Sequence, residues 1–115
     1  MSWQPIDFGE LVPGESGVTA TGTGQSDGYR IVKKITVFTT VATGTAAVLP
    51  SSYASGTELT IINRGANGLR LYPSENDQVE TYGVNAYVTV AAGGNASVVS
   101  FDPPASPSPR TWWLS

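Results

Sequence analysis

The fold of this chain is decided by one stretch, TELTIINRGANGLRLYP, at residues 57–73. Apolar and polar residues alternate through 57–63 and again through 69–72, and a period of two is typical of half-buried strands. Asn67-Gly68 stands between the two runs and favours the tight turn that joins paired strands. The sequence therefore predicts a β-hairpin, and Pro73 ends its second strand because proline cannot donate to a sheet.

Similar short runs lie on both sides of this stretch, and no run has the length and period of an ordinary helix. A second hairpin is expected where Gly93-Gly94 separates two alternating segments. The further strands are expected at 29–41, 46–49, 78–81, 87–91, 96–101 and 111–114. Strands at this spacing predict an all-β domain, an antiparallel β-sandwich or small barrel of about seven to eight strands.

The 115 residues provide for one domain, expected at 29–115. Residues 1–28 are expected to form an extended N-terminal arm, in which the glycine- and threonine-rich part 19–28 is typical of a flexible linker. The arm carries large apolar residues that need a surface elsewhere. These candidates for partner contact are Trp3, Ile6, Phe8 and Leu11. A proline- and serine-rich connector at 102–110 leads to the closing strand.

Composition excludes several kinds of function. The chain has no histidine and no cysteine, so thiol nucleophiles, disulfides and Ser-His-Asp triads are absent and the usual zinc ligands are lacking. The net charge is −3 with six basic residues, which argues against a nucleic-acid partner. No apolar run approaches the length of a membrane span, so no membrane partner is expected either.

Three short patterns are candidates for site chemistry. Glu75, Asp77 and Glu80 could supply a pair of catalytic carboxylates, and Glu75-Asn76-Asp77 offers oxygen ligands for calcium. Such residues more often form a solvated turn. Gly22-Thr23-Gly24 lacks the third glycine and the helix of a dinucleotide site. We therefore expect no enzyme activity, no cofactor and no metal.

The aromatic residues leave two alternatives open. Tyr53, Tyr72, Tyr82 and Tyr87 could stack on sugars or fill strand faces and subunit contacts. Trp112 and Trp113 are adjacent, so in a strand their side chains point to opposite faces. One is expected to enter the core, and the other then faces outward. We therefore also count both tryptophans among the candidates for partner contact.

Residues 37–113 resemble small structural proteins that are common in tailed bacteriophages. The resemblance is carried by TTVATG at 39–44, VLP at 48–50, GTELTIINRGAN at 56–67 and LRLYP at 69–73, with Asn85, Gly93 and Trp112. It implies a jelly-roll-like β domain in the virion, often a trimer on the exterior of the capsid, and no catalytic motif. The first 28 residues and the proline-rich connector fall outside the match.

The resulting hypothesis is a capsid decoration (cement) protein, made in the host cytoplasm, that binds the major capsid protein on the outside of the shell as a homotrimer. An apolar arm and a β surface of low charge suit such adhesion, because interfaces need contact area without unpaired buried ions. Two alternatives stay open. They are a head-fibre or tail-associated structural protein, and a carbohydrate-binding module for the host surface.

Overall fold

A computed structural model describes residues 14–51, 55–102, 106–107 and 109–114. Within these residues the chain contains strands and no helix, which confirms the all-β class. The strands are β1 (Gly14–Thr19), β2 (Tyr29–Arg30), β3 (Ile35–Thr40), β4 (Ala46–Val48), β5 (Glu58–Asn63), β6 (Leu69–Tyr72), β7 (Gln78–Val79), β8 (Val88–Val90), β9 (Asn95–Ser100) and β10 (Thr111–Leu114).

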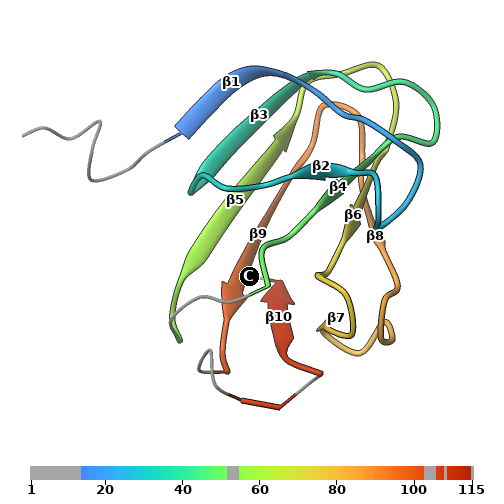
Figure 1. Cartoon of the computed structure of the whole chain (residues 1–115). Coiled ribbons are helices and arrows are strands. Elements are labelled where there is room, and N and C mark those ends of the chain that lie inside the picture. The colour runs from blue at the N-terminus through green and yellow to red at the C-terminus, as the bar shows by residue number, and fades with distance from the viewer. Residues whose placement is uncertain (1–13, 52–54, 103–105, 108, 115) are drawn as a thin grey trace, which may run out of the picture.

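The strands form two sheets that enclose one core (Figure 1). The larger sheet has six strands in the order β1-β3-β5-β9-β10-β7, and the smaller has four in the order β2-β4-β6-β8. From β1 to β9 each successive strand belongs to the opposite sheet from the one before. The chain therefore winds around the core, and each return to a sheet places a new strand beside an earlier one, except that β7 pairs with the later strand β10.

This winding makes the sheets mixed. The pairs β1–β3, β3–β5, β2–β4, β4–β6 and β7–β10 are parallel, whereas β5–β9, β9–β10 and β6–β8 are antiparallel. The expectation of an antiparallel fold of seven to eight strands is therefore wrong, and the described residues form ten strands. The reason is that the windings from β1 to β6 bring the chain back to each sheet in the same direction, which no hairpin can do.

Both predicted hairpins are corners between the sheets. β5 belongs to the larger sheet and β6 to the smaller, and the same holds for β9 and β8. A two-residue type I′ turn needs positive φ at both central residues, but neither Asn67 nor Gly68 has a positive φ. The polar stretch between β5 and β6 therefore crosses from one sheet to the other.

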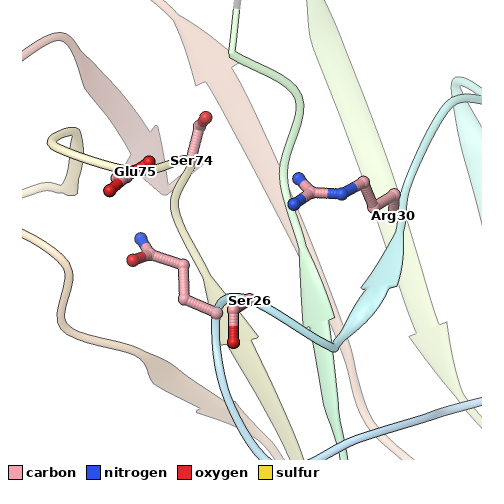
Figure 2. A pocket seen from close by; sticks show the side chains of 5 residues that line it. Ser26, Arg30, Ser74 and Glu75 are labelled. Carbon is pink, nitrogen blue, oxygen red and sulfur yellow. The ribbon is translucent and has the colours of Figure 1, made fainter.

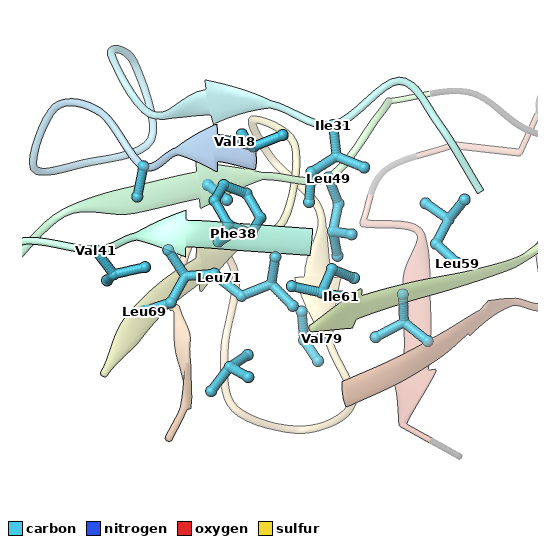
Figure 3. Close-up of a cluster of buried hydrophobic side chains, with 14 of the residues drawn as sticks. Val18, Ile31, Phe38, Val41, Leu49, Leu59, Ile61, Leu69, Leu71 and Val79 are labelled. Carbon is cyan, nitrogen blue, oxygen red and sulfur yellow. The ribbon is translucent and has the colours of Figure 1, made fainter. Parts of the chain in front are cut away.

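Alternation within the strands fills the core, as the sequence analysis expected. Phe38, Ile61 and Leu71 are fully buried, and Figure 3 shows them among the other apolar side chains between the strands. Phe38 also meets Tyr29 edge to face, with ring centroids 5.6 Å apart. Alternate residues of β3 and β5 consequently face outward, away from this core.

The segment that was expected to be an extended arm divides into two parts. Residues 1–13 lie outside the described residues, and residues 14–19 form β1, whose Val18 is buried in the core. The interpretation of 19–28 as a flexible linker is wrong. Asp27 Oδ1 accepts the Thr23 and Gly24 amides at 3.1 and 3.0 Å.

Residues 21–28 cover the outer face of β4. A Cβ atom added to Gly28 would lie 2.9 Å from Val48 Cγ2 and 3.2 Å from Ala46 Cβ, so the backbone of Gly28 lies directly on these side chains. Ala46 and Val48 are buried, although they point away from the core. This packing explains why a stretch with linker-like composition is ordered.

Replacing Gly65 with alanine is expected to destabilise the corner between β5 and β6 by about 1–3 kcal/mol. The new Cβ would lie 2.7 Å from the backbone nitrogen of Val41 and from its Cβ, and neither atom can rotate away. Urea unfolding measures the loss. The control is Gly24→Ala, whose Cβ would meet only Asp27 Oδ1, at 4.0 Å. Equal stability of the two variants would contradict this account of Gly65.

Candidate functional site

The outer face of the six-stranded sheet is the first candidate site. Thr36 and Phe38 of β3 point inward and are buried, so Ile35 and Val37 point outward. On the outward side of the sheet Val37 lies beside Ile62, and Val99 lies beside Trp113, with the polar pair Thr60 and Ser97 between these two apolar groups. We call the following set the apolar outer face: Ile35, Val37, Ile62, Val99 and Trp113, together with Phe101, which directly follows β9.

Two large aromatic side chains are the most exposed part of this face. Trp113 is 43% exposed and Phe101 is 68% exposed. Trp112, the neighbour of Trp113, is buried in the core. The prediction that adjacent tryptophans point to opposite sides is therefore confirmed.

A groove is the second candidate site. It encloses about 490 Å³ and is lined by Tyr82, Tyr87, Val88, Thr89, Asn95, Ala96, Ser97 and Leu114. These residues come from the loop between β7 and β8, from β8 itself, and from β9 and β10. β8 is the last strand of the smaller sheet, whereas the larger sheet continues past β9 to β10 and β7. The groove therefore lies where the smaller sheet stops.

Tyr82 and Tyr87 are the exposed aromatic residues of this groove, at 59% and 41%. Contacts on β6 hold Tyr87 in place. Its ring centroid lies 5.2 Å from that of Tyr72 and 5.1 Å from the guanidinium carbon of Arg70. Tyr72 thus has a packing role, while Tyr53 lies outside the described residues.

Two of the three acidic residues considered for catalysis, Asp77 and Glu80, have structural partners, as does Asp102. Asp77 is buried, and its Oδ1 accepts the Arg110 amide at 3.0 Å. Glu80 Oε2 accepts the Leu114 amide at 3.0 Å, and Asp102 Oδ2 accepts that of Thr111 at 2.9 Å. These carboxylates attach the last described segment to the rest of the fold. No sequence motif indicated the pairing, since the partners are far apart in the chain.

The calcium candidate Glu75-Asn76-Asp77 forms a turn, as its composition favoured. The Asp77 amide donates to the Ser74 carbonyl at 3.0 Å, and Asn76 has a φ of 70°, which asparagine tolerates better than most residues. Among the residues that the structure describes, no group of three or more metal-ligating side chains could hold an ion. Gly22-Thr23-Gly24 lies in the ordered loop that Asp27 supports.

A smaller pocket of about 260 Å³ lies beside that loop, between Gln25, Ser26, Arg30, Ser74 and Glu75 (Figure 2). Gln25 Nε2 already donates to the Pro73 carbonyl at 2.8 Å and to Asn85 Oδ1 at 3.0 Å. Gln25 therefore joins the loop to the end of β6, which gives the pocket a structural explanation.

Two shifts of pKa reflect such structural bonds. Hydrogen bonds from the Gly24 and Thr23 amides lower the pKa of Asp27. The Tyr29 hydroxyl donates a hydrogen bond to Glu15, and this bond raises the pKa of Tyr29. Burial and the charge of Glu15 add to this effect. Glu15 belongs to β1 and Tyr29 to β2, so this bond connects the two sheets.

The structure thus brings some of the expected partner-contact residues to the surface and leaves others undescribed. Trp113 lies on the apolar outer face, and Trp112 lies in the core. The remaining candidates, Trp3, Ile6, Phe8 and Leu11, lie outside the described residues.

Comparison of the chain with protein-family models, with curated proteins and with solved structures finds no match. In the described part of the chain, no helix has the length and apolar character needed to cross a membrane.

Proposed function

We propose that this chain is a non-enzymatic structural protein of a tailed-phage virion, a capsid decoration protein that binds the outside of the shell. Its partners would be the major capsid protein and two further copies of itself. The observation that carries the proposal is the apolar outer face, on which Trp113 is exposed beside Val99, and Phe101 is exposed directly after β9. The resemblance of residues 37–113 to phage structural proteins supports the same function.

Adhesion of this kind needs area and a few anchoring side chains. Interfaces of standard size bury about 1,600 Å² in total, and tryptophan is prominent among the residues that dominate binding energy. A sheet face supplies a broad surface of low relief. Charged residues make up only 13% of the chain, so few charged side chains would lose their hydration when the protein docks.

We expect Trp113→Ala and Phe101→Ala each to weaken binding to the shell about tenfold or more, because each removes a large aromatic anchor. Heads of the encoding phage, prepared without this protein, would be mixed with each variant and sedimented. Tyr82→Ala is the matched control, since Tyr82 is also an exposed aromatic residue but lies in the groove.

Unchanged binding of both variants would contradict a role for the apolar outer face. Light scattering of the free protein tests the homotrimer, and heating of filled heads with and without the protein tests stabilisation. Cryo-microscopy of labelled particles locates the protein. Density confined to a head fibre or the tail would replace the decoration role by a fibre- or tail-associated one.

A further inference from the structure

The groove between β8 and β9 has the dimensions and surface of a small-molecule site. Its volume of about 490 Å³ lies within the range of about 300–1,000 Å³ that such sites occupy. Two tyrosine rings contribute to its walls, and Val88, Ala96 and Leu114 are apolar residues that pack against the core beneath. The groove therefore combines aromatic walls with an apolar base.

The groove is uncharged. None of the described residues that line it is acidic or basic, and its polar members are hydroxyl and amide residues: Tyr82, Tyr87, Thr89, Asn95 and Ser97. A charged ligand would lose water there without gaining an opposite charge from the lining residues. The chemistry therefore fits a neutral ligand that has both an apolar face and many hydroxyl groups.

The backbone of β9 adds polar groups to this site. Ser100 donates its amide to Thr57 and accepts from Gly56, so it faces β5. In an antiparallel ladder alternate residues face opposite neighbours, so Asn95 directs its N–H and C=O away from β5. The described pairing of β10 with β9 stops at Leu114 and Val98, so it does not reach Asn95.

The position of Tyr87 is fixed before any ligand arrives. Tyr72 and Arg70 hold its ring from β6, and the side chain is still 41% exposed. A ring that is already held loses little conformational freedom on binding. Tyr87 can thus offer a rigid surface to the C–H face of a sugar ring, while Tyr82 provides the second wall.

We propose that this groove binds a neutral saccharide, with Tyr87 and Tyr82 as stacking surfaces and Asn95 as a polar contact. This inference goes beyond the decoration role, because none of the residues that line the groove belongs to the apolar outer face, although the groove adjoins that face where Asn95 lies beside Ile62. A protein on the outside of a particle that carries such a groove would hold the particle weakly to a glycan-coated surface, and many copies would add their effects.

The test is a titration of the ¹⁵N-labelled full chain, followed by NMR. The probes are four neutral disaccharides: maltose, cellobiose, lactose and N,N′-diacetylchitobiose. We expect at least one to shift the amides of groove residues in a saturable way with a Kd of about 1 mM. Sialyllactose, which adds a carboxylate to lactose, should bind no better than lactose. If no probe gives saturable shifts at about 50 mM, the proposal is overturned.

Variants separate a binding role from a structural one. Tyr82→Ala should weaken binding about tenfold, and Tyr82 is exposed enough for the fold to tolerate the change. Tyr87→Phe keeps the ring and should keep binding. Phe101→Ala is the matched control, because Phe101 is an exposed aromatic residue outside the groove. Full binding by Tyr82→Ala would contradict the stacking role.

The proposal for the groove and the proposal for the apolar outer face can be contradicted separately. Groove variants should still sediment with phage heads, and Trp113→Ala should still bind the saccharide. If the groove amides respond to shell subunits and to none of the four disaccharides, the groove is a protein contact and the saccharide proposal is wrong.

Discussion

Asn63→Ala is expected to lower the free energy of unfolding by about 3–5 kcal/mol, although it removes only one small polar group. Asn63 is fully buried. Its Nδ2 donates to the carbonyls of Asn67 and Val90 at 2.8 and 2.9 Å, and its Oδ1 accepts the Gly65 amide at 2.9 Å. Alanine leaves these three backbone groups without the partner, and each such loss costs about 1–3 kcal/mol.

Urea unfolding, followed by the tryptophan fluorescence to which the buried Trp112 contributes, measures this loss. Asn67→Ala is the matched control in the same corner, because the Asn67 side chain donates one hydrogen bond, to the Val41 carbonyl at 2.9 Å. We expect this variant to lose about 1–2 kcal/mol. An Asn63→Ala protein within about 0.5 kcal/mol of the parent would show that water replaces the amide at no penalty.

Asp77→Ala is expected to cost about 3–5 kcal/mol, because it removes one partner of a buried charged pair. The carboxylate of Asp77 is 1% exposed and lies 3.6 Å from Nη2 of Arg110. It also accepts the Arg110 amide. Without Asp77 the segment that leads into β10 loses its anchor, so the amides of 111–114 should exchange with solvent faster than those of β5.

Two further variants test this explanation. Asp77→Asn keeps an acceptor for the Arg110 amide and should lose less, about 1–2 kcal/mol. Glu75→Ala changes an exposed acid in the same turn and should stay within about 0.5 kcal/mol of the parent. Equal losses for Asp77→Ala and Glu75→Ala would mean that the pairing with Arg110 contributes nothing.

The positions of the strands were largely predictable, but their partners were not. Alternation at 57–63 and 69–72 reflects which side of a strand is buried, so it placed β5 and β6 correctly. Alternation does not indicate which other strand pairs with a given strand. An inward-facing set of residues serves equally well in a hairpin and in two strands on opposite sides of one core. The corner was therefore mistaken for a hairpin turn.

The candidate surfaces were predictable to different degrees. The opposite orientation of Trp112 and Trp113 follows from geometry within one strand. The groove depends on residues from β8, β9 and β10, and no local pattern indicates that Tyr82 and Asn95 line one cavity. The structural roles of Asp77 and Glu80 could not be predicted either, because each accepts a hydrogen bond from an amide more than 30 residues away in the sequence.

The place of β10 between β9 and β7 has a consequence for biosynthesis. β7 joins the six-stranded sheet through β10. Residues 78–79 can therefore pair in this sheet only after residues 111–114 have been synthesised. Trp113 belongs to the same strand, β10. A chain that stopped before residue 111 would therefore lack both the strand that joins β7 to the six-stranded sheet and the exposed Trp113.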